Sequence, residues 1–366
     1  MSLIDKTLFT RLEQGADRTV SLQGKSYLFF GGTAYLGLPR HPEFIRLYQE
    51  GMARFGVNVG SSRNNNVQLG IYPEAEAWAA ARFSAEDAML MSSGFLAAQL
   101  CIRRLSARIP KVYYAPESHP AILSDHAKVG SGSFADWVKE TVQDINTHQD
   151  TEFLIVSNTL NSLKPERFDF SAFKAVDPGK KVHFLLDDSH GIGITGKGKG
   201  SMHFGVPTRA NFKTTIIASL AKGLSIDAGL ILSDKATLSD FRSSSLYSGA
   251  SPSAPAAAYT LMHAGSLYDA RLERLRENQK LLLELLQVPH VSIPEFPVYF
   301  MEMPELGDLL MEKDIIISSF SYPRPSDPPF NRVVLSSAHT APDIKTLCGV
   351  INRAFEIKTK SSTILN

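Results

Sequence analysis

Between residues 86 and 235 the sequence alternates short apolar runs with segments of helical periodicity. The apolar runs are bounded by turn residues and occupy residues 88–91, 111–115, 153–157, 183–187, 215–219 and 229–233. This alternation is typical of an α/β protein, because parallel strands need helical crossovers that cover the sheet. We therefore predict a mostly parallel central sheet with helices on both faces. In such sheets, ligands bind beyond the carboxyl ends of the strands.

The remaining segments predict a division into domains. Residues 253–288 have the pattern of one long helix, and shorter strands are expected around residues 291–303. A final helix is expected over 341–358, because Pro342 and Asp343 favour a first helical turn. We predict an N-terminal segment (1–45) that packs with the small domain, a large cofactor-binding domain (46–250) and a smaller α+β C-terminal domain (251–366). Residues 321–331 are expected to form an irregular surface or active-site loop.

Composition and charge exclude several classes of protein. The 366 residues carry 38 Lys+Arg against 37 Asp+Glu, so no global field attracts nucleic acid. No run of about 18 apolar residues is present, so no membrane span is expected. The N-terminus lacks the features of a secretion signal, and the expected location is the cytoplasm. Cys101 and Cys348 each lie in a helical pattern, which favours reduced core residues over a disulfide or a zinc site.

The run HFLLDDSHG (183–191) ends a buried strand with two acids and a histidine. An acid at a strand end can keep a heterocyclic nitrogen protonated by charge pairing. Two other interpretations stay open for this stretch alone. The acid could cap a helix and the histidine could lie in a loop. Asp187, Asp188 and His190 could also bind a metal, although no matching cluster of ligands follows.

The run SLAKG (219–223) places Lys222 among small and apolar residues. Burial there would lower the pKa of Lys222, which makes the amine available to form a Schiff base with an aldehyde. For an isolated lysine, a head group that reaches solvent is more common. The combination of a strand-end acid, a nearby histidine and a later lysine is more specific than any one of them.

Seven motifs in order carry a resemblance to a known family. They are AYLGL (34–38), MSSGFLAAQL (91–100), APESHPAIL (115–123), DDSH (187–190), SLAK (219–222), YSGASP (247–252) and RVVLSSAHT (332–340). The chain resembles the α-oxoamine synthases, which are class II aminotransferase-like enzymes of fold type I. The resemblance implies the fold-type I transferase fold, the cofactor pyridoxal 5'-phosphate and no metal.

The resemblance also assigns roles around the cofactor ring. Lys222 would carry the cofactor as a Schiff base, the internal aldimine. Asp187 would pair with the pyridinium nitrogen, and His190 would hydrogen-bond the 3-oxygen of the ring. His119 would stack on the pyridine ring.

Other motif residues would contact the phosphate. The resemblance assigns this role to Ser93, Gly94 and Phe95 at the start of a helix, and to Ser219. Ser248 lies in the segment that reaches the phosphate of a neighbouring subunit in the family. A homodimer with shared active sites is therefore implied.

The substrate side is less similar to the family. Arg332 would bind the substrate carboxylate through its bidentate fork. Asn158 replaces the usual glutamate, Ser162 is kept, and both would lie on the substrate side. Ser189 replaces an alanine, and GLSIDAG (223–229) replaces a glycine-rich GGxGG stretch, so backbone positions that glycine allows are expected to differ.

The implied activity is the condensation of a small amino acid, namely glycine, alanine or serine, with an acyl thioester of coenzyme A or acyl-carrier protein. Loss of the amino acid carboxylate follows in most members, and Lys222 would act as general base. An aminotransferase on the same scaffold is an alternative. A catalytically silent partner subunit is a further one, but it would be expected to lack the Schiff-base lysine. The sequence does not fix the amino acid, the acyl chain or the pathway.

Overall fold

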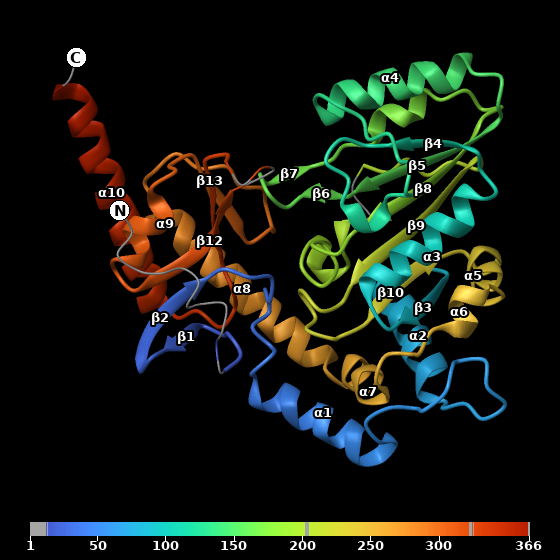
Figure 1. The fold of residues 1–366 in the computed structure, drawn as a ribbon, viewed down its shortest axis with the longest axis horizontal. Coiled ribbons are helices and arrows are strands. Elements are labelled where there is room, and N and C mark those ends of the chain that lie inside the picture. The colour runs from blue at the N-terminus through green and yellow to red at the C-terminus, as the bar shows by residue number, and fades with distance from the viewer. Residues whose placement is uncertain (1–11, 13, 202–204, 322–323, 325, 365–366) are drawn as a thin grey trace. The chain divides into compact units, whose positions relative to one another are not determined.

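The structure is a computed structural model that describes residues 12, 14–201, 205–321, 324 and 326–364. The chain divides into two compact units (Figure 1). The larger unit comprises residues 43–161 and 166–266, and the smaller unit comprises residues 1–42, 162–165 and 267–366. Residues 251–266, which we expected in the small C-terminal domain, therefore lie in the larger unit.

A six-stranded sheet forms the centre of the larger unit, in the order β3-β10-β9-β8-β5-β4 (Figure 1). Every apolar run predicted between residues 86 and 235 is a strand of this sheet. The parallel strands β4, β5, β8 and β9 are neighbours, whereas β10 is antiparallel to β9 and to β3. The mostly parallel sheet is thus confirmed. The strands are β3 (Asp87–Met91), β4 (Lys111–Tyr114), β5 (Glu152–Asn158), β8 (Lys181–Asp187), β9 (Phe212–Ser219) and β10 (Gly229–Ser233).

Successive side chains of each strand point to opposite faces of this sheet, and both faces are covered by other elements. Leu185 and Ile217 belong to a buried cluster with residues of α3 (Gly94–Ser106) and α5 (Lys235–Arg242). On the opposite face, the ring of Phe184 lies 6.1 Å from that of Phe170 and 5.1 Å from that of Phe173. This two-sided burial explains why the strands read as continuous apolar runs.

Further helices and one short hairpin complete the larger unit. Ser93 and Ser133 cap α3 and α4 by accepting hydrogen bonds from the backbone NH groups of Leu96 and Asp136, each at 3.1 Å. These elements are α1 (Pro42–Phe55), α2 (Ile71–Arg82), α4 (Phe134–Thr147), α6 (Ser245–Gly249), α7 (Pro255–His263), the 3-10 turns η2 (Pro120–Ile122), η3 (Ser171–Ala175) and η4 (Gly196–Gly198), and the hairpin of β6 (Leu160–Asn161) and β7 (Glu166–Arg167).

The prediction of one helix over residues 253–288 is wrong. The segment forms α7, which ends at His263, and α8 (Gly265–Leu285). Ala264 ends the first helix and is followed by Gly265, a residue that favours helix termini over helix interiors.

The smaller unit contains a five-stranded sheet in the order β1-β2-β12-β13-β11. Gln23 and Gly24 join β1 to β2 with φ values of 50° and 77°, as a tight hairpin turn requires. Strand β2 lies parallel to β12, so strands from both ends of the chain share one sheet. The elements are β1 (Thr19–Leu22), β2 (Lys25–Phe30), β11 (Val298–Met301), β12 (Ile315–Ser321), β13 (Pro329–Val334), α8, α9 (Leu306–Met311) and α10 (Ala341–Ile364).

Helix α10 confirms the predicted C-terminal helix. Around residues 291–303 the structure has β11 and an isolated bridge between Val291 and Phe300. The segment 321–331 is partly regular, since β12 ends at Ser321 and β13 begins at Pro329. Residues 322, 323 and 325 of this segment lie outside the described residues.

The two cysteines are buried and free, Cys101 in α3 and Cys348 in α10. Within the ranges that the structure describes, no helix combines the length and apolar character that crossing a bilayer requires.

Candidate active site at the carboxyl edge of the large sheet

The carboxyl ends of β3, β4, β5, β8 and β9 lie at one edge of the large sheet. The register places Asp187 opposite Asn158 and Ile217, and it places Gly229 opposite Met91 and Ser219. Most of the predicted site residues belong to these strand ends or to the segments that follow them directly. They are Ser93, Gly94, Phe95, His119, Asn158, Asp187, His190, Ser219 and Lys222.

Lys222 lies in a tight loop that leaves β9 at this edge. The loop is closed by hydrogen bonds from Leu220 N to Ala228 O (2.9 Å) and from Ile226 N to Leu220 O (3.1 Å). Burial lowers the pKa of the Lys222 ammonium, and the charge of Asp187 offsets part of this effect. Among the described residues, the ammonium has no hydrogen-bond or salt-bridge partner. A partly buried amine of this kind is suited to nucleophilic attack on an aldehyde.

Asp187 is held in place at the end of β8. Its Oδ1 accepts a hydrogen bond of 2.9 Å from the backbone NH of Ser189. The hydroxyl of Ser189 in turn accepts a hydrogen bond of 2.8 Å from the backbone NH of Ser219. His190 follows and is partly buried. The acid, the histidine and the serine that were predicted as cofactor contacts therefore lie on connected strand ends.

The N-terminus of α3 lies directly against Ser219. A Cβ atom added to Gly94 would lie 2.6 Å from the Ser219 Cβ, so only glycine fits this approach. Ser93 caps the helix through the NH of Leu96, and the amides of Gly94 and Phe95 have no intrahelical acceptor. Free amides at a helix N-terminus, beside a hydroxyl, form a suitable site for a phosphate group.

The loop that carries His119 is fixed by Asn158. Asn158 Oδ1 accepts a hydrogen bond of 3.1 Å from His119 N, and Asn158 Nδ2 donates one of 2.9 Å to Glu117 O. The Glu117 carboxylate accepts a further hydrogen bond from the side chain of Asn161. Both ends of the Asn158 amide thus hold this loop, a structural use that the sequence did not indicate.

Asp188 is a second residue whose role the sequence did not indicate. Its side chain is fully buried, and its oxygens accept hydrogen bonds from Thr159 Oγ1 (2.5 Å) and from Ser201 N (2.8 Å). A Cβ added to Gly191 or to Gly200 would overlap the same carboxylate. Asp188 therefore anchors the loop that follows β8, and the nearby glycines are the signal in the sequence.

The metal interpretation of Asp187, Asp188 and His190 gains no support from this geometry. Both oxygens of Asp188 are used by donors within the fold. In the part of the chain that the structure describes, no group of three or more His, Cys, Asp or Glu side chains could hold a metal ion.

The burial of Asp188 predicts a pH-dependent stability. Burial raises the pKa of Asp188 from its ordinary value of 3.8 to about 7, so the folded chain binds this proton more tightly than the unfolded chain. The stabilisation is complete below pH 3.8 and is lost as the pH rises to about 7. We expect the unfolding free energy of the wild type, relative to Asp188→Asn, to fall by about 1.4 kcal/mol per pH unit in this range.

Urea denaturation at several pH values measures this difference. Asp125→Asn, at an exposed position, serves as the control. Its unfolding free energy, plotted against pH, should run parallel to that of the wild type. Parallel curves for Asp188→Asn and the wild type would contradict the prediction.

In the smaller unit, Arg332 and Ser162 lie together. Arg332 Nη1 donates a hydrogen bond of 2.5 Å to the backbone oxygen of Ser162, and the guanidinium lies 5.2 Å from the Phe320 ring. Its Nε is buried and has no partner among the described residues. Burial lowers the pKa of Arg332, and Tyr35 offsets part of this effect. A buried guanidinium with an unused donor is suited to bind a carboxylate.

Two motifs from opposite ends of the chain form one structural support in the smaller unit. Ser337 donates from its backbone to Tyr35 O (2.9 Å) and from its hydroxyl to Leu36 O (2.6 Å). The Nε2 of His339 lies 2.9 Å from Phe29 O. The contacts of Ser337 join AYLGL to SSAHT, and the contact of His339 joins SSAHT to β2.

Ser248 lies in helix α6 and not on a strand of the large sheet. Its hydroxyl accepts a hydrogen bond of 2.7 Å from Asn64 Nδ2 and donates one of 3.0 Å to Ser244 O. Its contact with the phosphate of a neighbouring subunit stays a prediction.

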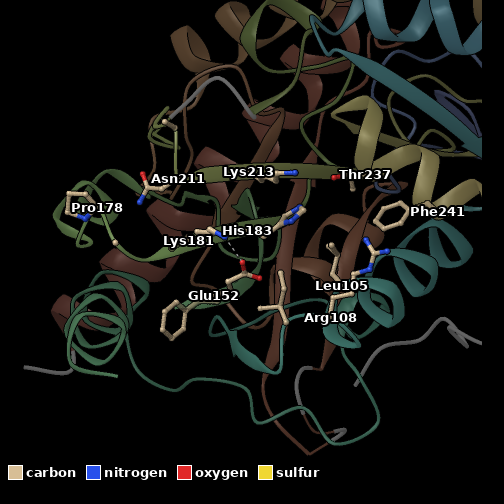
Figure 2. Close-up of a pocket in the computed structure, with 15 residues that line it drawn as sticks. Leu105, Arg108, Glu152, Pro178, Lys181, His183, Asn211, Lys213, Thr237 and Phe241 are labelled. Carbon is tan, nitrogen blue, oxygen red and sulfur yellow. Dashed lines mark hydrogen bonds and ion pairs between the residues drawn. The ribbon is translucent and has the colours of Figure 1, made fainter. Parts of the chain in front are cut away.

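A cavity of about 640 Å³ lies at the opposite, amino edge of the same strands (Figure 2). Its lining includes Lys181 and Glu152, which form an ion pair of 2.8 Å, and Lys213, whose Nζ lies 3.7 Å from Asp234. The cations here are already paired with acids. Most of the predicted site residues lie at the carboxyl edge, and none of them lines this cavity.

Solved structures share the fold of this chain. A serine palmitoyltransferase from S. paucimobilis, solved with a PLP–myriocin aldimine, matches with a TM-score of 0.78 and 17% identity over 95% of this chain and 92% of that one. An 8-amino-7-oxononanoate synthase from Francisella tularensis matches with a TM-score of 0.69 and 19% identity over 91% and 99%. The fold is that of the fold-type I pyridoxal-phosphate transferases, as predicted.

Sequence comparison finds similar enzymes. An 8-amino-7-oxononanoate synthase from Citrobacter koseri is 27% identical over 362 residues, which cover 93% of each chain. One from Salmonella dublin is 26% identical over 284 residues, which cover 75% of this chain and 71% of that one. No family model matches the chain. The chain is thus similar over most of its length to 8-amino-7-oxononanoate synthases, in agreement with the resemblance to the α-oxoamine synthases that its motifs indicated.

Proposed function

We infer that the chain is a pyridoxal-phosphate-dependent C-acyltransferase that condenses a small amino acid with an acyl thioester. The observation that carries this inference is Lys222, a desolvated amine without a partner among the described residues. Lys222 follows Ser219, the last residue of β9, by three positions. The charge of Asp187 raises the pKa of Lys222 and offsets part of the effect of burial. The presence of this lysine disfavours the silent-subunit alternative.

The residues at the carboxyl edge fit the cofactor. Lys222 would hold its aldehyde carbon covalently, and Asp187 would pair with the ring nitrogen through the oxygen that Ser189 leaves free. His119 would lie on the ring face and His190 beside the ring oxygen. When bound, pyridoxal phosphate supplies an electron sink for negative charge at the α-carbon of the amino acid.

The phosphate would be held by α3 and β9. The amides of Gly94 and Phe95 and the hydroxyls of Ser93 and Ser219 are the donors. The close approach of Gly94 to Ser219 supports this assignment, because it places both elements around one small volume.

Proton transfer and substrate binding use other residues. Once released from the cofactor, the amine of Lys222 would take the proton from the α-carbon, since its lowered pKa leaves it neutral more readily. Arg332 would bind the amino-acid carboxylate through its unused Nε and its terminal nitrogens. The backbone oxygen of Ser162 would orient Arg332 by accepting a hydrogen bond from its Nη1.

The second substrate, the assembly and the location complete the proposal. We propose an acyl-coenzyme A as the thioester, with a free thiol as the leaving group. We also propose a homodimer in which Ser248 contacts the cofactor phosphate of the partner. The buried, free cysteines Cys101 and Cys348 support the reducing cytoplasm as the location.

The test is to incubate the purified protein and pyridoxal phosphate with acyl-coenzyme A and one of glycine, alanine or serine. We expect a visible absorbance band with the cofactor, a change of that band with the correct amino acid, and release of free thiol. Carbon dioxide release would show whether the carboxylate is lost. A keto acid without free thiol would favour the aminotransferase, and no cofactor band would contradict the proposal.

Arg332 gives a more specific prediction about the amino acid. Arg332→Lys should raise KM for the amino acid by roughly 10- to 100-fold with a smaller change in kcat, because one ammonium cannot replace a bidentate fork. Steady-state kinetics measure both constants. Arg324→Lys, at a side chain that is 78% exposed, is the matched control. Equal KM values for Arg332→Lys and the control would contradict the carboxylate role.

A further inference from the structure

Ser189 joins two of the proposed cofactor contacts. Its backbone NH donates to Asp187 Oδ1 at 2.9 Å, and its hydroxyl oxygen accepts from the backbone NH of Ser219 at 2.8 Å. The side chain is buried, with a relative exposure of 4%. One residue therefore contacts both the acid proposed for the ring nitrogen and the serine proposed for the phosphate.

The two hydrogen bonds depend differently on the residue at position 189. Any amino acid except proline would supply the NH to Asp187. Only a side chain with an acceptor atom close to its Cα can accept the hydrogen bond from the backbone NH of Ser219. The DDSH motif of this chain differs from the DDAH of the resembling family at this position, and alanine has no such acceptor.

The position of Ser219 explains why this bond matters. The β8–β9 ladder ends at the pair Asp187 and Ile217, so the NH of Ser219 lies beyond it on that side. Ser219 also begins the segment that leads to Lys222, and it packs against Gly94 at the start of α3. Movement of Ser219 would therefore be passed to the free amides of α3.

We propose that Ser189 is a positioning residue that fixes the phosphate contacts relative to Asp187. This proposal rests on the proposed function, because it assumes that pyridoxal phosphate binds at the carboxyl edge. The ring nitrogen and the phosphate of that cofactor are joined by the ring and a short CH2–O link, so the distance between them is confined to a narrow range. Ser189 sets the matching distance in the protein by linking the end of β8 to the end of β9.

The test compares ligands with and without a phosphate. Ser189→Ala should bind pyridoxal phosphate about tenfold more weakly, as expected for one lost hydrogen bond to a buried NH. Its affinity for pyridoxal, which lacks the phosphate, should change little. Ser189→Thr keeps the hydroxyl and should restore the wild-type ratio of the two affinities. Inorganic phosphate should also raise the melting temperature of the cofactor-free protein less in Ser189→Ala than in the wild type or in Ser189→Thr.

Ser233→Ala is the matched control for the loss of a buried serine hydroxyl. Ser233 ends β10 at the opposite edge, where its hydroxyl lies 2.8 Å from Thr215 Oγ1. This variant should lower the melting temperature and leave the ratio of the two affinities unchanged.

Three outcomes would overturn the proposal, and they are distinguishable. No binding of pyridoxal phosphate by the wild type would refute the proposed function, and the positioning role with it. Binding by the wild type and equal binding by Ser189→Ala would refute the positioning role alone. Equal losses for pyridoxal and pyridoxal phosphate would show that Ser189 has only a structural role.

Discussion

Lys222→Ala should show no visible absorbance band with pyridoxal phosphate and should lose at least about 10³-fold in kcat/KM. The magnitude follows because the substitution removes both the covalent attachment of the cofactor and the proposed general base, and positioned acid–base groups alone contribute about 10² to 10⁴. Absorbance titration and steady-state thiol release measure the two effects. The fold should persist, because the Lys222 ammonium has no hydrogen-bond or salt-bridge partner among the described residues.

Lys213→Ala is the control for this experiment, since Lys213 lies on the same strand, β9, at the opposite edge. Its side chain is 59% exposed and lies near Asp234. This variant should retain the band and the activity. A band in Lys222→Ala that matches the wild type would exclude Lys222 as the attachment point.

Gly229→Ala should lower the unfolding free energy by about 3 kcal/mol and weaken cofactor binding. A Cβ at this position would overlap the carbonyl oxygen of Ser93 and lie 2.9 Å from the nitrogen of Gly94. Both obstacles are backbone atoms, so the start of α3 or strand β10 must move. Because Gly94 is also a proposed phosphate donor, the same shift would disturb the phosphate contacts. Urea denaturation and cofactor titration measure the two effects.

Gly249→Ala gives the matched glycine control. A Cβ there would meet no atom within 4 Å, and Gly249 ends helix α6 without a positive φ. Its stability should stay within about 0.5 kcal/mol of the wild type. If both alanine variants were equally stable, the close packing of β10 on the start of α3 would be excluded.

The region after Lys222 shows how the fold tolerates the loss of family glycines. Ser225 has a φ of 55°, in the left-handed region that glycine favours, and its hydroxyl is buried without a partner among the described residues. The stretch GLSIDAG therefore keeps a glycine-like backbone conformation at Ser225 without a glycine there. Hydrogen bonds that close the loop from Leu220 to Ala228 hold this conformation.

The sequence was sufficient to predict the sheet and to indicate the resemblance to the α-oxoamine synthases. Strands such as 153–157 and 183–187 were predictable because burial on both faces makes them continuously apolar. Lys222 and Asp187 could be proposed from sequence because covalent cofactor chemistry requires an amine and an acid, and few residue types supply them. The break between α7 and α8 was missed, because an apolar helical pattern continues through Ala264 and Gly265.

The tertiary structure alone decided how these groups are supported. The hydrogen bonds from Thr159 and Ser201 to Asp188, from His119 to Asn158 and from Ser219 to Ser189 join residues that lie on different strands or loops. Such partners depend on strand order and register, which periodicity along one chain does not contain. Local patterns thus indicated which residues are the candidates for the chemistry, and the packing of distant segments determined which residues hold them in place.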